Sequence, residues 1–340
     1  MRNFNAENER LKRRYIDYLK EVKGQDQKSL DKAIAALVKF EESTKYKPFK
    51  KFHIEQARTF KNTLVAAKNP STGKPLSLST IDATLRLVKG FFIWLASQQG
   101  YKKVVTYADA EYFNNNAKDA RAAHTQRPAH FPSIKAAMHA FQAMPEHTEL
   151  QQREKAIFAF MMLTCARVSA AATLKLKHIN LIDGSVFQDG REVDTKKNKI
   201  FTTYFYPVDQ AYLDYFTGWV NFLRNDKLFG PEDPLFPKPK RELINGKFVF
   251  KEVSREPYSN GTKINATIKQ AFANVQLQEY TPHSFRKTLG LLLSEMELPI
   301  ETQKAWSQNM GHENFVTTVN SYIPVCEQRQ AELIRGLSQN

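Results

Sequence analysis

The sequence predicts a mainly α-helical protein of two domains, with one small antiparallel sheet in the second domain. A chain of 340 residues is longer than a single core usually fills. Apolar residues recur at helical spacing through most of the chain, and strand-like patterns gather only around residues 185–206. Charge also divides the chain, because residues 1–130 hold 25 Lys and Arg against 13 Asp and Glu, whereas residues 131–340 hold 25 against 22.

The first part is predicted to be helical throughout, and its clearest helix is "STIDATLRLVKGFFIWLASQQG", residues 79–100. One apolar stripe runs along it, formed by Ile81, Leu85, Val88, Phe92 and Leu95. Ser79 or Thr80 is predicted to cap its start, and Gly100 to end it.

The polar side of the same helix offers candidate phosphate contacts, namely Thr80, Thr84, Arg86 and Lys89. Solvent-exposed surface is the alternative interpretation of these residues. The net charge of +15, concentrated in the first part, favours a polyanionic partner such as double-stranded DNA.

Other classes of protein have little support in the sequence. The longest apolar run, residues 156–166, has eleven residues, about half of the ~20 that a membrane span needs, so a buried helix is expected there. There is no secretory signal, and the two cysteines, Cys165 and Cys326, show no metal-ligand spacing. We therefore expect a cytoplasmic protein without a membrane partner.

A polar, basic stretch containing two prolines separates the two parts. We assign residues 1–118 to a helical DNA-binding domain, 119–133 to a basic linker and 134–340 to the second domain. In the second domain helices are expected first. Strands should follow around 185–188, 191–195 and 200–206, with a Lys-rich turn at 196–199. A helix at 209–223, a Pro-rich loop at 230–248 and short helices from about 262 complete the prediction.

Motifs for nucleotide-driven or metal-dependent chemistry are missing from the sequence. It contains no GxxxxGK[ST], GxGxxG, HExxH or CxxC motif, and no acidic cluster of the kind that binds two metal ions. We therefore expect neither a cofactor nor a metal.

Basic and hydroxyl groups are better organised, although each is weak evidence alone. Arg167 directly follows the apolar run, and a buried partner carboxylate is the alternative to an anionic ligand. His283 and Arg286 share one helix face. His312 follows a glycine, and Tyr322, on its own, would be a packing residue.

Together these groups suit phosphoryl transfer without a metal. Arginines can stabilise the charge of a pentacoordinate phosphorus, and a histidine can take the proton of a tyrosine nucleophile. A lysine can then protonate the leaving oxygen.

In this order the motifs resemble those of the tyrosine recombinases, the phage-type integrases. "ARVSAAATLKLKHI" is similar to the family's first arginine motif, "DTKKNKIFTTYFYPV" to its lysine hairpin, "HSFRKT" to its second basic motif and "MGHENFVTTVNSY" to its last one. The resemblance covers residues 131–325 well. The helical first part is less specifically similar to the family's SAM-like core-binding domain.

The resemblance implies a site-specific DNA recombinase whose two domains close on DNA as a C-shaped clamp. Tyr322 would form a 3′-phosphotyrosine, with Arg167, Arg286 and His312 on the phosphate and His283 as base. Lys196 fits best as the acid, although Lys197 or Lys199 could serve. Neither ATP nor a metal would be required. The resemblance further implies DNA attachment sites as substrate and exchange through a Holliday junction. The assembly would be a DNA-bound homotetramer of subunits that are monomeric or weakly associated when free.

It also implies a mobile genetic element as origin, a phage or a genomic island, with accessory DNA-bending or directionality factors as further partners in the bacterial nucleoid. A catalytically inactive DNA-binding relative and a type IB topoisomerase-like enzyme are the alternatives. The tail "CEQRQAELIRGLSQN" has Ala331, Ile334 and Leu337 at helical spacing, and should dock on a neighbouring subunit or on its own domain.

The sequence departs from the family pattern at several positions. Ten residues separate His312 from Tyr322, where nine are usual. Ala170 stands where many members have Glu, and His178 and Asn180 stand where acidic residues are common. These departures remove acidic support expected around Arg167, but they change none of the six proposed catalytic positions. An additional N-terminal arm-binding domain is not expected.

Overall fold

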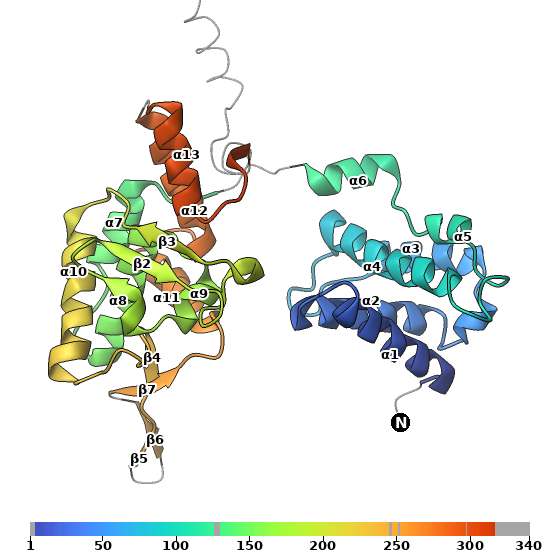
Figure 1. Cartoon of the computed structure of the whole chain (residues 1–340), viewed down its shortest axis with the longest axis horizontal. Coiled ribbons are helices and arrows are strands. Elements are labelled where there is room, and N and C mark those ends of the chain that lie inside the picture. Colours follow the sequence, from blue (N-terminus) through green and yellow to red (C-terminus); the bar gives the residue numbers. More distant parts are fainter. Residues whose placement is uncertain (1–3, 126–129, 245–246, 251, 297, 317–340) are drawn as a thin grey trace, which may run out of the picture. The chain divides into compact units, whose positions relative to one another are not determined.

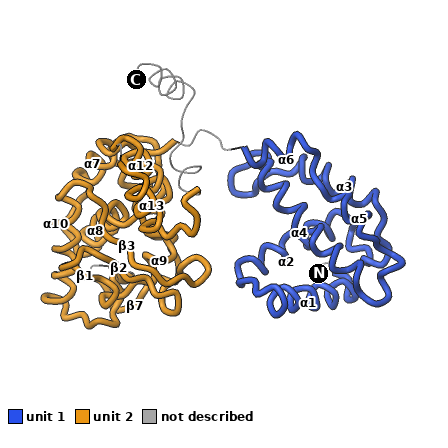
Figure 2. Tube along the Cα trace, turned by 45° about the horizontal axis from the view of Figure 1, so that its top comes forward, with its two compact units in different colours: residues 1–128 blue, residues 129–340 orange. Residues whose placement is uncertain are grey.

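The computed structural model describes residues 4–125, 130–244, 247–250, 252–296 and 298–316. The chain divides into two compact units, residues 1–128 and 129–340 (Figure 2). Both are mainly helical, and the strands of the second unit are short and antiparallel, which confirms the predicted fold class (Figure 1).

The first unit is a set of helices around an aromatic core. Its helices are α1 (Ala6–Glu21), α2 (Gln27–Ser43), α3 (Ile54–Ala66), α4 (Leu78–Ala96), α5 (Tyr107–Glu111) and α6 (Ala117–His124). Phe40 lies at the centre, with its ring 5.3 Å from that of Phe60 and 5.2 Å from that of Phe92. Because aromatic rings bury large apolar areas, this cluster stabilises the unit independently of the second core.

Helix α4 contains the predicted apolar stripe, and all five of its residues are buried. The helix begins earlier than predicted, because Ser77 is its cap and accepts a hydrogen bond from the Thr80 amide. It also ends earlier, at Ala96, so Gly100 (φ +84°) lies in the following turn.

The basic stretch predicted as linker begins within a helix. Residues 117–124 form α6, capped by Asn116, whose side chain accepts from the Asp119 amide. This helix belongs to the first unit and contacts α4 there. The apolar spacing of α6 was too sparse to indicate a helix, because all of its side chains are exposed or half-buried.

The second unit is built around α8 (Glu149–Thr164), in which every residue from Ala156 to Thr164 is buried. It contacts α7 (Ile134–Gln142), α10 (Gln210–Asn221), α11 (Thr262–Asn274) and α12 (Pro282–Glu295). The unit also contains α9 (Val168–Thr173) and α13 (Ile300–Asn309). The buried-helix prediction is thus confirmed. Among the described residues, no helix is long and apolar enough to span a bilayer.

A three-stranded antiparallel sheet has the order β1 (Ile179–Asn180), β2 (Ser185–Gln188), β3 (Phe201–Tyr204). In the register of β2 and β3, Ser185 is opposite Tyr204 and Gln188 is opposite Phe201. The strand predicted at 191–195 is wrong, because these residues form a turn and a loop that lead into a 3₁₀ turn at Lys196–Asn198. The predicted Lys-rich turn therefore lies between β2 and β3.

Further strands replace much of the predicted Pro-rich loop. β4 (Pro237–Pro239) pairs with β7 (Val253–Pro257), and β5 (Glu242–Ile244) pairs with β6 (Lys247–Val249). Together they extend from the body of the unit as a narrow ribbon (Figure 1). The prolines do not prevent pairing here because each ladder has only two strands, so every strand has an open edge that needs no partner.

Candidate active site

A sharp corner at the end of α8 places the first candidate residue. Cys165 ends the helix in a left-handed conformation (φ 48°), and its amide still donates to the Met161 carbonyl. Two residues later Arg167 caps α9, and its carbonyl accepts from the Ala171 amide at 2.9 Å. Arg167 is partly exposed.

Helix α12 presents the second pair of candidates. Pro282 is its first residue, which suits a position without a helical N–H partner, and His283 follows in the first turn. Arg286 lies one turn further and is only 3% exposed. The spacing of three residues places both side chains on one face, as predicted.

Arg286 joins three parts of the unit through its guanidinium. Nη1 donates to the Cys165 carbonyl at 2.6 Å, and Nη2 donates to the Met310 carbonyl at 2.7 Å. Nη2 also lies 2.9 Å from Nε2 of His312. Because arginine can only donate, neutral His312 accepts on Nε2 and carries its proton on Nδ1.

The turn that holds His312 requires glycine. Gly311 has φ +72°, and a Cβ at this position would lie 2.7 Å from Cζ of Phe201. Its amide donates to the Gln308 carbonyl at 2.7 Å, and the His312 amide donates to the Ser307 carbonyl at 3.2 Å. The glycine therefore lets the chain turn tightly against β3 directly before His312.

Helix α13 is fastened to the open edge of β3. The Asn309 side chain accepts from the Tyr204 amide at 2.7 Å and donates to the Tyr204 carbonyl at 2.8 Å. The Thr203 hydroxyl donates to the Asn309 carbonyl at 3.1 Å. The asparagine amide thus pairs with β3 as a neighbouring strand would, and it fixes the position of the turn that follows.

The lysine turn has an unusual backbone that its surroundings hold in place. Lys197 and Asn198 both have positive φ, 62° and 51°, a conformation that asparagine tolerates better than lysine. The Thr195 hydroxyl donates to the Lys199 carbonyl at 2.8 Å and closes the turn. Gly190 permits the close approach of the preceding loop, since a Cβ there would lie 2.1 Å from the Asn198 carbonyl oxygen.

Both ends of the lysine turn contact other candidate segments. On one side, the Ser169 hydroxyl donates to the Asp194 carbonyl at 2.9 Å, and the Asp194 amide donates to the Thr173 hydroxyl at 2.9 Å. On the other side, Lys199 donates to the Gly311 carbonyl at 3.3 Å. Lys199 therefore reaches the turn at Gly311, whereas Lys196 is exposed.

These bonds connect the four segments in a closed ring. Arg286 connects α12 to Cys165 and to the Met310–His312 turn. Helix α13 and Lys199 connect that turn to the lysine hairpin. Ser169 and Thr173 connect the hairpin back to α9. Figure 1 shows the elements concerned, α9, α12, α13 and β3, on one part of the second unit. Segments far apart in the sequence therefore form one local, positively charged cluster.

Burial and, after it, the positive charge of this cluster lower the pKa of both histidines. Burial is the largest cause for His312, and the charges of Arg286, Arg167, Lys199 and Lys196 add to it, so that its pKa is about 4. For His283, desolvation by the surrounding protein is the largest cause that lowers the pKa, and the charges of Arg286, Lys287 and Arg167 lower it further. Both histidines are therefore mainly neutral at neutral pH, and neutral His283 can accept a proton.

Some predicted residues lie outside the described residues. Tyr322 is one of them, and so are Cys326 and the tail with Ala331, Ile334 and Leu337. The ring consequently contains Arg167, His283, Arg286, His312 and the lysine turn, and the position of Tyr322 stays a prediction.

In the first unit, the predicted phosphate contacts do not share one exposed face. Thr84 is buried, and its hydroxyl donates to the Thr80 carbonyl at 2.8 Å. Lys89 pairs with Glu111 at 2.8 Å, and Arg86 lies 3.2 Å from Asp82. Thr80 is exposed. Helical spacing alone put Thr84 on the polar side of α4, but its side chain is buried in the unit.

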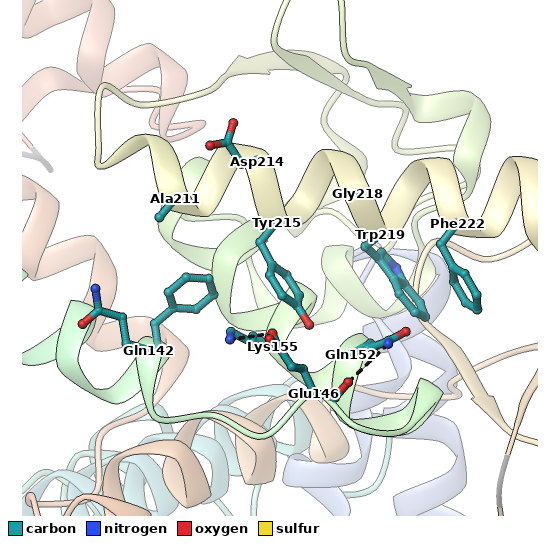
Figure 3. A pocket seen from close by; sticks show the side chains of 11 residues that line it. Gln142, Glu146, Gln152, Lys155, Ala211, Asp214, Tyr215, Gly218, Trp219 and Phe222 are labelled. Atoms are coloured by element: carbon teal, nitrogen blue, oxygen red, sulfur yellow. Dashed lines mark hydrogen bonds and ion pairs between the residues drawn. The ribbon is translucent and has the colours of Figure 1, made fainter.

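A groove of about 870 Å³ also opens in the second unit, between α10 and the segment from α7 to α8 (Figure 3). Its lining combines apolar rings with Lys155, whose ammonium pairs with Glu146 at 2.7 Å and lies 4.9 Å from the centre of the Tyr215 ring. None of the residues of the closed ring of segments described above lines this groove. Among the described residues, no three His, Cys, Asp or Glu side chains are grouped as metal ligands.

Sequence reasoning missed the residues that hold the cluster together. The Cys165 carbonyl and the Asn309 amide act through long-range contacts that have no local pattern. Glu313 pairs with Lys199 at 3.0 Å. Its position could have been noticed in the sequence, because it directly follows the candidate residue His312.

Comparison with known proteins gives a consistent picture. Residues 132–329 match the model of the phage integrase family. A structure of the Tn1549 transposon integrase in complex with a circular intermediate DNA is 14% identical, with a TM-score of 0.63 over 96% of this chain and 99% of that chain.

A structure of a lambda integrase dimer bound to a COC′ core site is likewise 14% identical, with a TM-score of 0.61 over 92% of this chain and 94% of that chain. At such identities the similarity concerns the fold. No curated protein matches the sequence.

Proposed function

The chain belongs to the phage integrase family, and on that premise we propose that it is a site-specific DNA recombinase that cuts and rejoins DNA through a 3′-phosphotyrosine at Tyr322. The observation that carries the proposal is the closed ring, which gathers two arginines, two neutral histidines and a lysine turn from four segments. These are the groups that an in-line attack on a phosphodiester needs.

In the first step the Tyr322 oxygen attacks the scissile phosphorus while the bond to the 5′ oxygen breaks. His283 takes the phenolic proton. Its lowered pKa permits this because the imidazole is neutral at pH 7. A lysine of the turn gives its proton to the departing 5′ oxygen. The products are a 3′-phosphotyrosyl ester and a free 5′-hydroxyl, and attack by the 5′-hydroxyl of another strand reverses every transfer.

Arg167, Arg286 and His312 act on the phosphate itself. Arg167 is partly exposed and contacts the non-bridging oxygens directly. Arg286 is buried and contributes positive charge while it orients His312, whose Nδ1 carries the proton when Nε2 accepts from Arg286. Lys196 is the predicted acid, and the contact of Lys199 with the Gly311 carbonyl supports Lys199 as the alternative.

The remaining parts of the proposal concern DNA and assembly. Residues 1–118, the more basic part of the chain, bind duplex DNA beside the cut, 119–133 connect the domains, and 134–340 form the catalytic domain with its tail helix. The two solved relatives named above were bound to DNA, which supports DNA attachment sites as substrate. We also propose a homotetramer on DNA, accessory bending or directionality factors, a phage or genomic island as origin, and a place in the bacterial cytoplasm.

The test is the trapping of a covalent adduct. Nicked duplexes that tile the DNA flanking the gene are incubated with the protein in EDTA, and a denaturing gel separates protein joined to DNA. We expect an adduct with wild type and none with Tyr322→Phe. An adduct that forms equally with Tyr322→Phe contradicts the assignment of the nucleophile, and one that EDTA abolishes contradicts metal independence.

The same assay separates the alternatives. A wild-type protein that binds these duplexes without ever forming the adduct is a DNA-binding relative without catalysis. If the adduct forms, the topology of the products from supercoiled DNA decides between strand exchange and topoisomerase-like relaxation.

A further inference from the structure

Glu313 brings a negative charge into the cationic ring. Its carboxylate lies 3.0 Å from Nζ of Lys199 and 3.4 Å from Nζ of Lys197, and Lys199 also donates to the Gly311 carbonyl. Hydrogen bonds from Lys199 and Lys197 lower the pKa of Glu313, so the carboxylate is ionised at neutral pH. Two of the three lysines of the turn are thus neutralised within the protein.

The carboxylate has the features of a phosphate oxygen pair. Like a phosphodiester, it carries one negative charge on two oxygens, and each oxygen accepts from a different lysine. The side chain is 58% exposed and follows a glycine turn, so it can rotate into solvent without disturbing the core.

We propose that Glu313 takes the place of a DNA phosphate at Lys197 and Lys199 in the DNA-free protein, and that DNA must displace it before these lysines can act. The proposal rests on the proposed function, because it assigns the lysines to a DNA phosphate. Glu313 then weakens binding and limits cleavage until a correctly placed phosphate competes successfully for the lysines. DNA whose phosphate does not reach Lys197 and Lys199 is therefore bound less tightly and cleaved less.

The physical basis is competition for the same cations. A carboxylate held at 3.0 Å repels an incoming phosphate and satisfies the lysine that the phosphate needs. If the carboxylate is replaced by a neutral amide, the lysines are released for DNA. Each lysine that gains a phosphate contact adds ~0.9 to the slope of log affinity against log salt.

The experiment compares Glu313→Gln with Glu279→Gln. Glu279 is a matched control, since it pairs with Lys269 at 3.3 Å elsewhere in the second unit and its side chain is 59% exposed. Its replacement by Gln removes the same charge as Glu313→Gln. Binding to a duplex of about 30 base pairs is measured over a range of KCl concentrations. We expect Glu313→Gln to bind roughly 3- to 10-fold tighter at low salt, with a slope steeper by about one to two units, and Glu279→Gln to change affinity less than about 2-fold.

A double-mutant cycle identifies the partner lysine. The gain from Glu313→Gln should largely disappear in a Lys199→Ala background, because the released cation is then missing. An undiminished gain in a chain that carries both Lys197→Ala and Lys199→Ala overturns the proposal, and so does an equal gain from Glu279→Gln, which would reflect net charge alone.

Cleavage distinguishes this proposal from the function on which it rests. With the duplex that traps wild type, Glu313→Gln should form the adduct faster. If it forms the adduct more slowly with unchanged binding, the carboxylate supports the lysines instead and the proposal is wrong. If wild type forms no adduct, the recombinase assignment fails, while the binding measurements still decide the role of Glu313.

Discussion

The ring has two parts that differ in how firmly they are held. The buried arc consists of Arg286, Cys165, Met310 and His312, where one guanidinium that is 3% exposed donates to two main-chain carbonyls and an imidazole. The exposed arc consists of residues 196–199 and Glu313, where Lys197 and Lys199 form ion pairs with a carboxylate that is 58% exposed. The buried arc belongs to the folded core, whereas the exposed arc can rearrange without unfolding anything.

This difference indicates a division of tasks. Under the proposed function, the groups that meet the phosphate with fixed geometry are held by buried main-chain acceptors, which cost free energy when they lose their donor. Groups that transfer a proton or exchange partners are held by ion pairs in water, which contribute little to stability. The following predictions test the contrast.

The largest effect is expected from Arg286→Ala. The free energy of unfolding should fall by ~2–4 kcal/mol, because the Cys165 and Met310 carbonyls lose a buried donor. Adduct formation should fall by at least ~10³-fold. Urea unfolding and the adduct assay measure the two effects. Arg224→Ala is the control, since Arg224 also spans two carbonyls in this unit, those of Leu176 and Ile179, and should leave cleavage intact.

Gly311→Ala should come next, with a loss of ~1–3 kcal/mol. Part of this loss comes from the left-handed backbone and part from the overlap of the new Cβ with Phe201. Gly100→Ala separates the two, because Gly100 has φ +84° and no heavy atom within 4 Å of an added Cβ. Equal losses in the two variants would contradict a tight contact between the His312 turn and β3.

The pH dependence of stability should show the buried arc directly. The pKa of His312 is about 4 in the folded protein, below the ~6.5 of an unfolded chain. Between these values the unfolded chain binds a proton that the folded protein does not. The free energy of unfolding therefore falls as pH drops from ~6.5 towards 4. Urea unfolding of wild type and His312→Gln at several pH values should show a smaller decrease for the variant.

The smallest effect on stability is expected in the exposed arc. Lys196→Ala, Lys197→Ala and Lys199→Ala should each change the free energy of unfolding by less than ~0.5 kcal/mol. Cleavage should fall for the lysine that protonates the leaving oxygen, and a 5′-thio leaving group, which needs no proton, should restore it. A loss of stability comparable to that of Arg286→Ala would remove the distinction between the arcs.

Local patterns predicted the helices well, and the contacts between them poorly. The apolar stripe of α4 and the buried run of α8 could be predicted, because the spacing of apolar residues in adjacent helical turns shows whether one face or the whole helix is buried. The strand predicted at 191–195 failed because its residues hold the lysine turn against α9 instead of pairing. The candidate residues Arg167, His283, Arg286 and His312 were found by motif order. The acceptors that organise them were hidden because carbonyl groups occur at every position.

The bonds of the ring also determine when the site can exist. Arg286 and Cys165 are 121 residues apart, Lys197 and Glu313 are 116 apart, and Asn309 and Tyr204 are 105 apart. Such contacts close long loops and form only after large parts of the chain have come together. No single helix or hairpin can preserve them in a fragment. Recovery of cleavage during refolding should therefore follow completion of the whole second unit, and it should lag behind the recovery of helical structure.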